Sequence, residues 1–291
     1  MTDLEIDRRS ALLGGGLMTA ATLAGLPISA DAATKAVIDT QDPRAMMSVL
    51  ARLQGDLSGR LSYGYQRGRV YGLVAGQGLA LGDYGRRLYD YESGSVGRSR
   101  LLPNGDVETR SRTSLFYIDP ASGAYLKSWR NPITGDEIEV PPLRRGVAGG
   151  TLTPTGPSVN ANDALESSVF GSPAALEFKT IGERTWVSRH AFTRWTPTGG
   201  TRARSEMTLD TWIVATRDLR DTRLTTIPAT SSWTSQTEWQ TWLQMPEGQP
   251  GQQLWRSDGV KVSEVSALPA SFVAQCRTRH RGMLSDPIVF D

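Results

Sequence analysis

Three turn sequences between residues 97 and 140 constrain the fold of this chain more than any other feature. The turns are Pro103-Asn104-Gly105-Asp106, residues 119–123 and residues 131–135, and each separates two runs that are rich in strand-forming residues. Asn-Gly and Pro-containing turns between such runs are strong hairpin signals. The segment therefore predicts a meander of antiparallel strands over 98–102, 107–118, 124–130 and 137–140.

The rest of the chain repeats the pattern of β-rich runs and short turns. We expect further strands over 60–65, 69–74, 86–91, 177–181, 184–195, 203–216 and 229–237. Residues 141–175 are rich in Gly, Pro, Ser and Thr and are expected to form a long loop. Helices are expected after Asp42-Pro43 and over Ala270 to Arg281. About nine or ten strands with little helix predict an all-β antiparallel fold, a barrel-like meander with a peripheral C-terminal helix.

Residues 1–32 have the order of a secretory signal. Arg8-Arg9 precedes an uncharged run over 11–28 that is rich in Gly and Ala, and the run closes on Ala30-Asp31-Ala32. Consecutive arginines ahead of a weakly hydrophobic core are typical of the twin-arginine type. We expect the twin-arginine translocase to export the folded chain to the periplasm, where the signal is removed and no stable membrane insertion remains. A retained anchor is the alternative, which the glycines and Pro27 within the run weaken.

The composition limits the classes of function. The formal net charge is +2 and the arginines are dispersed, so no basic run of the kind that binds nucleic acid is present. His190, His280 and Cys276 are the only imidazoles and thiol, so a zinc or copper site is poorly supplied. We expect no metal and no other cofactor. Residues 33–291 are long enough for one substantial core, and we expect a single barrel-like domain there.

Two groups of motifs resemble one protein family. The first runs from Leu115-Phe116-Tyr117-Ile118-Asp119 through Ser128-Trp129-Arg130-Asn131-Pro132 to Gly135, and the second holds Trp242-Leu243-Gln244-Met245 and Leu268-Pro269. This order resembles the bacterial and fungal family known as domain of unknown function 1838, whose members often carry twin-arginine signals. The resemblance covers residues 42–290. It implies one domain and export, and it implies no reaction and no catalytic residue.

Aromatic residues are distributed unevenly along the chain. All eight Tyr lie between Tyr63 and Tyr125, and seven of the eight Trp lie from Trp186 onward. If the sheet closes, strands from the two halves face one lumen, which suits a flat and largely apolar ligand held by a few polar groups. The alternative is that these residues form the core of an ordinary β-protein. The sequence contains no G-x-S-x-G, H-E-x-x-H, P-loop or C-x-x-C motif.

A small set of polar and aromatic residues is predicted to form such a site. His190 is the natural general acid or base because histidine titrates near neutrality, and the alternative is a surface or core histidine. Arg112 and Arg130 are placed to bind a carboxylate or to pair with Glu108 and Glu139. The candidate catalytic residues are His190, Tyr63, Tyr89 and Glu206. The candidate ligand-binding residues are Tyr65, Tyr91, Tyr117, Trp129, Trp186, Trp212, Arg112 and Arg130.

Two functions from different classes fit these observations. The first is a cofactor-independent enzyme of the lyase, isomerase or hydratase type, which acts on a small hydrophobic or aromatic compound in the lumen. The second is a non-catalytic periplasmic protein that binds or carries such a compound. A buried cluster of His, Tyr and carboxylate side chains favours the enzyme, whereas a lumen lined by apolar residues favours the carrier.

Overall fold

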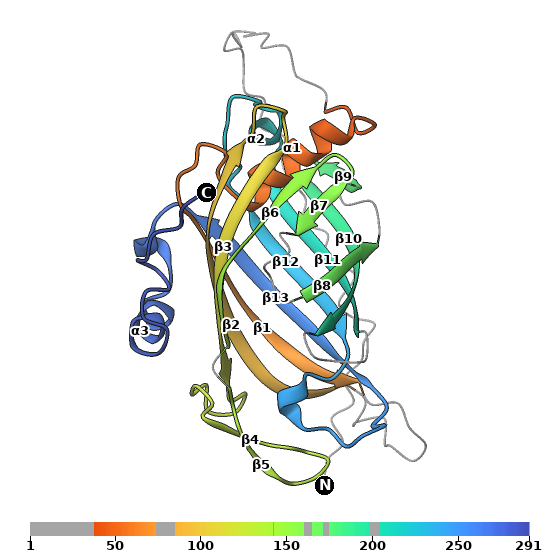
Figure 1. Cartoon of the computed structure of the whole chain (residues 1–291), viewed down its shortest axis with the longest axis vertical. Coiled ribbons are helices and arrows are strands. Elements are labelled where there is room, and N and C mark those ends of the chain that lie inside the picture. The colour runs from red at the N-terminus through yellow and green to blue at the C-terminus, as the bar shows by residue number, and fades with distance from the viewer. Residues whose placement is uncertain are drawn as a thin grey trace, which may run out of the picture. The chain divides into compact units, whose positions relative to one another are not determined.

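Eleven antiparallel strands form one sheet in the computed structural model of this chain (Figure 1). The structure describes residues 38–73, 85–141, 143–159, 165–170, 175–197 and 204–290, so the predicted signal over residues 1–32 lies outside the described residues. The sheet contains β1 (Ser62–Leu73), β2 (Arg86–Leu101), β3 (Val107–Ile118), β6 (Leu143–Thr153), β7 (Gly156–Val159), β8 (Leu165–Phe170), β9 (Leu176–Ile181), β10 (Arg184–Pro197), β11 (Arg204–Ala215), β12 (Thr230–Thr237) and β13 (Gln252–Val262).

The strand order is β7-β6-β3-β2-β1-β13-β12-β11-β10-β8, and β9 also pairs with β10. The hairpin of β4 (Ser128–Arg130) and β5 (Glu137–Glu139) forms a separate two-stranded sheet. The helices are α1 (Pro43–Gln54), α2 (Thr216–Arg220) and α3 (Ala270–Arg279), with short 3₁₀ turns η2 (Thr241–Leu243) and η3 (Val265–Ala267). The predicted antiparallel all-β class is therefore confirmed. Among the described residues β7 and β8 form the two ends of the strand path, so closure into a barrel stays a prediction.

The predicted turns and both predicted helices are confirmed. Gly105 and Gly123 have φ values of 85° and 73°, in the left-handed region that glycine adopts readily. Asp119 fixes the second turn, because its carboxylate accepts hydrogen bonds from the backbone nitrogens of Ala121 and Ser122. Asp42 caps α1 by accepting from the backbone nitrogen of Arg44 at 2.9 Å.

Several predictions about strands are wrong. The strands expected over 60–65 and 69–74 are one continuous strand, β1, and those expected over 86–91 and 98–102 are one strand, β2. Residues 141–175 contain β6, β7 and β8 in place of a loop. The glycines of β6 hid this strand, and one of them has a packing reason: a Cβ at Gly149 would lie 2.4 Å from Cδ of Arg110 on β3. The expected strand over 124–130 is confined to β4. Residues 252–262 were not predicted as a strand, yet they form β13, which pairs with β1 over its whole length.

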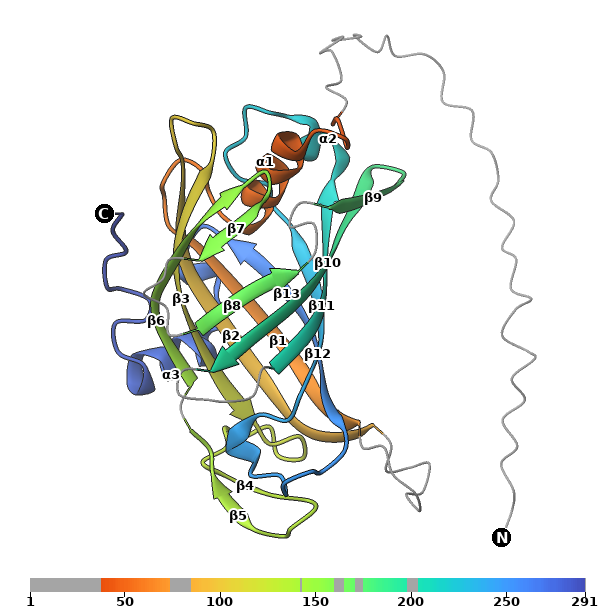
Figure 2. The same cartoon turned by 45° about the vertical axis from the view of Figure 1, so that its right-hand side comes forward.

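The sheet has two faces that are covered differently. We call the inner face the one that packs against α1, where Leu50 and Leu53 contact Val187, Trp212 and Val214 of β10 and β11. α1 lies at one end of the sheet and the β4–β5 hairpin at the other (Figures 1 and 2). No helix among the described residues is long and apolar enough to cross a membrane.

The outer face of β1, β2 and β3 packs against α3 and the residues that follow it. Phe272 is fully buried, and its ring centroid lies 5.8 Å from that of Phe116 and 5.4 Å from that of Tyr65. This approach depends on Gly94 of β2, since a Cβ there would lie 2.4 Å from the Phe272 ring. His280 then stacks on Phe116 and contacts Ser114 through Nδ1 at 2.8 Å. The C-terminal segment is therefore part of the core.

We predict that Phe272→Ala lowers the free energy of unfolding by about 3–5 kcal/mol, because the change leaves a cavity between α3 and the sheet. Urea unfolding followed by fluorescence measures this. Val289→Ala in the same C-terminal segment is the control, since Val289 is 62% exposed and its truncation should change stability by no more than about 0.5 kcal/mol. Equal, small effects of the two substitutions would contradict the packing described for α3.

Candidate functional site

The inner face encloses a cavity of about 680 Å³ next to α1. Side chains from β1, β2, β3, β12 and β13 line it, together with residues of α1, β6, β10 and β11. A volume of this size holds a small organic molecule. The cavity is therefore the candidate functional site.

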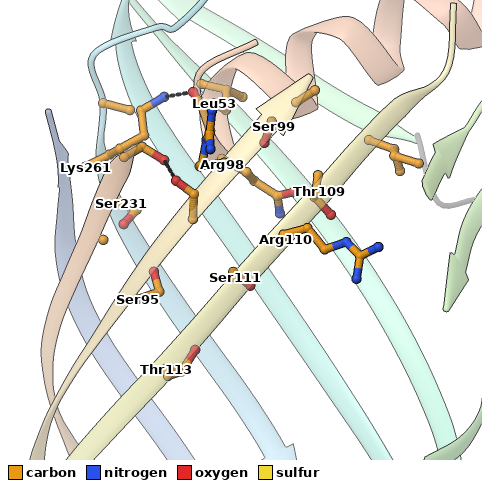
Figure 3. Close-up of a pocket in the computed structure, with 18 of the residues that line it drawn as sticks. Leu53, Ser95, Arg98, Ser99, Thr109, Arg110, Ser111, Thr113, Ser231 and Lys261 are labelled. Atoms are coloured by element: carbon orange, nitrogen blue, oxygen red, sulfur yellow. Dashed lines mark hydrogen bonds between the residues drawn. The ribbon is translucent and has the colours of Figure 1, made fainter. Parts of the chain in front are cut away.

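Small hydroxyl side chains form much of the wall (Figure 3). Strand alternation places every second residue on the inner face, so the odd-numbered residues of β2 and β3 point the same way. Register sets Ser95 opposite Thr113 and Ser99 opposite Thr109, with Gly97 opposite Ser111 between them. Each hydroxyl can both donate and accept a hydrogen bond. This wall therefore suits a ligand that carries polar groups.

Lys261 of β13 is the basic residue that points from the floor of the cavity toward α1. Its Nζ donates hydrogen bonds to the carbonyl oxygens of Arg52 and Gly55, at the C-terminal end of α1. Cations stabilise the exposed carbonyls at a helix C-terminus, so this contact ties α1 to the sheet. Burial lowers the pKa of Lys261 to about 7, and the nearby carboxylate of Asp56 opposes the shift.

The basic residues near the cavity differ in where their side chains point. Arg98, Arg110, Arg189 and Lys261 are among the described lining residues, which include no Asp or Glu. Arg98 and Arg110 have even numbers on β2 and β3, so their side chains point to the outer face. There Arg98 donates to the carbonyls of Gly59 and Ile288, and Arg110 pairs with Glu108 at 3.4 Å. The Arg189 guanidinium is held by Asp210, with Nε 3.0 Å from Oδ2, and lies 5.9 Å from the Trp212 ring centroid. Lys261 is therefore the basic side chain of the cavity wall that forms no ion pair with a carboxylate among the described residues.

At the other end of the inner face, aromatic residues from both halves of the chain come together as a packed cluster. Tyr89 lies at its centre, with ring centroids 5.0 Å from Tyr117 and 5.8 Å from Trp255. We call the buried set Tyr89, Tyr91, Tyr117, Trp129 and Trp255, with the partly buried Trp242 packed against it, the aromatic cluster.

Hydrogen bonds fix the aromatic cluster. Gln253 donates to the Tyr89 hydroxyl at 2.7 Å, and Trp129 donates to the Leu88 carbonyl at 3.2 Å. The Tyr117 hydroxyl donates to the side chain of Gln240 at 3.1 Å. Tyr89, Tyr91, Tyr117 and Trp129, which the sequence predicted as site residues, therefore pack as core and do not line the cavity.

Several predicted site residues lie on the outer face. The Tyr65 hydroxyl donates to the buried carboxylate of Glu92 at 2.9 Å, beneath α3. Tyr63 belongs to the same core as Phe272. Arg112 neither faces the cavity nor pairs with Glu108, because its guanidinium donates to the carbonyls of Met283 and Asp286 in the C-terminal segment.

The remaining predicted residues are dispersed. His190 is exposed: it forms part of the cavity rim, but its side chain alternates with those of Arg189 and Ala191. Trp186 lies on the outer face beside Ser188. Arg130 is exposed and donates to the Gly135 carbonyl, and Glu206 accepts from Ser235. Of the predicted ligand-binding residues, Tyr65 and Trp212 line the cavity. The Tyr65 hydroxyl bonds to Glu92 on the outer face, whereas Trp212 packs in the inner-face cluster with α1.

Asn131 joins the two groups of motifs that carry the family resemblance. Its Oδ1 accepts from the backbone nitrogens of Ile133 and Thr134, and its Nδ2 donates to the Leu243 carbonyl at 2.9 Å. Asn131 is fully buried, so each of these bonds replaces a bond to water. The turn at 131–135 and the segment at 242–245 are therefore one structural unit that supports the aromatic cluster.

No group of three or more His, Cys, Asp or Glu side chains that could hold a metal ion occurs in the part of the chain that the structure describes.

Comparison with known proteins identifies the family. Residues 61–283 match the model of the family described as "Protein of unknown function (DUF1838)". The chain belongs to this family. Neither a search of curated proteins nor a search of solved structures finds a match. The match spans β1 to the residues after α3, so it contains the aromatic cluster and most of the cavity wall.

Sequence reasoning missed Lys261 and the hydroxyl wall. A signal was present, because residues 93–99 and 109–113 alternate small residues with larger ones at a period of two. Lys261 carried no local signal, since its place beside α1 depends on the pairing of β13 with β1. The hydroxyl wall was therefore readable from the sequence, and the role of Lys261 was not.

We predict that stability rises with pH between about 7 and about 10 because of Lys261. The unfolded chain keeps this proton up to the ordinary lysine pKa near 10.4, whereas the folded chain releases it near pH 7. Over this interval the free energy of unfolding of the wild type should therefore increase relative to that of Lys261→Met. Lys127→Met, at an exposed position, is the control. Parallel pH profiles for the wild type and Lys261→Met would contradict the assignment.

Proposed function

We propose that this protein binds a small organic molecule in the inner-face cavity, in the periplasm to which its predicted twin-arginine signal directs it. The observation that carries this proposal is the cavity itself, whose wall is lined by small hydroxyls and by Lys261. Protein interiors are normally close-packed, and side chains that filled the end of the sheet near α1 would add stability, as the aromatic cluster does at the other end. A cavity of about 680 Å³ on the same face as that cluster is therefore better explained as a ligand-binding site than as a packing defect.

The ligand class follows from the wall. Leu53, Leu152 and Trp212 offer an apolar surface, and the hydroxyls of β2 and β3 offer hydrogen bonds. Lys261, which forms no ion pair with a carboxylate among the described residues, favours a carbonyl or carboxylate group. We therefore infer a small amphipathic compound with an apolar part and a carbonyl or carboxylate part. The sheet then acts as a barrel-like container, with α1 over one end and the aromatic cluster filling the other.

The structure supports ligand binding better than it supports catalysis of proton transfer. The four residues that the sequence predicted as catalytic are poorly placed for such a reaction. The His190 side chain is exposed, and Tyr63 packs in the core beneath α3. Tyr89 is held by Gln253 inside the aromatic cluster, and Glu206 accepts a hydrogen bond from Ser235. A general acid or base must reach the reacting proton through at most one water. Of these four, His190 lies at the cavity rim with an exposed side chain, and Tyr63, Tyr89 and Glu206 do not line the cavity.

We predict that Ser231→Trp abolishes ligand binding and that Ser232→Trp does not. These adjacent serines of β12 point to opposite faces, and Ser231 lines the cavity whereas Ser232 does not. An indole at position 231 fills space that the ligand needs. Native mass spectrometry of protein purified from the periplasm, together with tryptophan quenching by a panel of aromatic carboxylates, measures binding.

Equal binding by the Ser231→Trp and Ser232→Trp variants would place the ligand elsewhere on the protein. A wild-type protein that carries no molecule and binds none of the panel saturably would remove the proposed function. Circular dichroism of both variants confirms that any loss is not a loss of fold.

We predict that the double substitution Arg8→Lys with Arg9→Lys stops export. The twin-arginine pair is the feature that the translocase reads, and lysine keeps the charge without the paired guanidinium groups. Cell fractionation with an antibody to the mature chain should find the unprocessed precursor in the cytoplasm. Unchanged processing and export would show that residues 1–32 act as a signal of another type.

A further inference from the structure

Glycines surround Lys261 on its face of the sheet and leave its side chain uncovered, which a lysine that only ties α1 to the sheet does not need. Its same-face neighbours on the sheet are glycines: Gly64 is its partner on β1, and Gly259 lies two residues before it on β13. Neither glycine has a side chain to cover the lysine, and both Lys261 and Gly64 line the cavity. A Cβ at Gly64 would lie 2.6 Å from Oγ of Ser95, its register partner on the neighbouring strand β2, so a side chain there would clash with Ser95.

A neutral amine can make both hydrogen bonds of Lys261. Its nitrogen has two carbonyl partners, Arg52 and Gly55, and it forms no ion pair with a carboxylate among the described residues. A neutral amine has two N–H donors and one lone pair, whereas an ammonium ion has three donors. Two carbonyl acceptors therefore satisfy the neutral form and leave its lone pair unused.

The charged groups that face this amine do not hold its proton. Asp56, which follows α1, pairs with Arg60 at 3.1 Å and accepts from the backbone nitrogen of Ser58. Arg52 of α1 adds a second positive charge nearby while donating to the Asp221 carbonyl. Burial is the largest cause of the lowered pKa of Lys261, which lies at about 7. At neutral pH a large share of this amine is therefore unprotonated and nucleophilic.

We propose that Lys261 forms a reversible imine with an aldehyde or ketone ligand in the inner-face cavity. This inference rests on the proposed binding function and names the reactive group of its ligand. The amine lone pair attacks the carbonyl carbon, and the electron pair of the C=O π bond moves to the oxygen. A proton passes from nitrogen to that oxygen to give a carbinolamine. Loss of water then forms the C=N bond, so that amine and carbonyl yield imine and water with no oxidant or reductant.

The test is reductive trapping on the folded mature protein at pH 7 with propanal and sodium cyanoborohydride, which converts an imine to a stable N-propyl lysine. Peptide mass spectrometry compares Lys261 with the exposed Lys127 and Lys179 as internal controls. An ordinary exposed lysine is neutral in only roughly one part in two thousand at pH 7. We expect Lys261 to be propylated at least about tenfold faster than either control, and we expect the preference to vanish in denaturant.

The Ser231→Trp and Ser232→Trp variants show whether propanal reaches Lys261 through the cavity. Trapping at Lys261 that is lost in the first variant and kept in the second supports an imine formed inside the cavity. Equal labelling of the three lysines in the folded protein, or a Lys261 that is spared, overturns the inference. If the proposed binding function itself is wrong, the result is different: native mass spectrometry and tryptophan quenching detect no molecule bound to the wild type in the absence of reductant. A ligand that binds reversibly while Lys261 stays unmodified would leave the binding function standing and overturn the imine alone.

Discussion

The pairing of β13 with β1 is the interaction on which the rest of the structure depends. Eleven residue pairs join residues 63–73 to residues 252–262, and they connect the first half of the chain to the second. This pairing makes one continuous inner face from strands that are distant in sequence. It sets Lys261 opposite Gly64, and it brings Trp255 beside Tyr89 and Tyr91. Without it the sheet would have neither the cavity nor the aromatic cluster.

The two faces of the central strands are packed differently. On the outer face α3 and the C-terminal segment bury Phe272 and His280 against β1, β2 and β3, and buried polar groups such as Glu92 and Arg112 have partners there. On the inner face the same strands change from large aromatic residues at one end to serine, threonine and glycine near α1. The outer face and the aromatic cluster supply stability, so the middle of the inner face is free to remain open.

Much of the fold followed from local sequence, because its turns and alternation are local features. The turns near Gly105 and Gly123 and the caps of α1 need only neighbouring residues, and β3 begins and ends where the pattern placed it. β6 was missed because its glycines carry no alternation, and β13 because its polar residues resemble a loop. Both are recognised only through their partners, β3 and β1.

The site was harder to predict than the fold. Tyrosines and tryptophans from the two halves of the chain do meet, as the sequence suggested, but they meet as core. Tyr65 faces either the inner-face cavity or α3, depending on which face of β1 carries the odd-numbered residues. That face is fixed by where α3 packs, and α3 lies far along the chain. Lys261 is significant only because the C-terminal carbonyls of α1 lie above it, and no pattern around residue 261 encodes that contact. Sequence therefore predicted the sheet and the meeting of its aromatic residues, and it did not predict the residues that line the inner-face cavity.

The most direct test of this account is a crystal structure of the mature protein purified from the periplasm of cells that export it. The account predicts density for an organic molecule in the inner-face cavity, with a polar atom within hydrogen-bond distance of Ser95, Ser111, Ser231 or Lys261. A cavity that holds only water, while a bound molecule occupies another surface of the same protein, would contradict it.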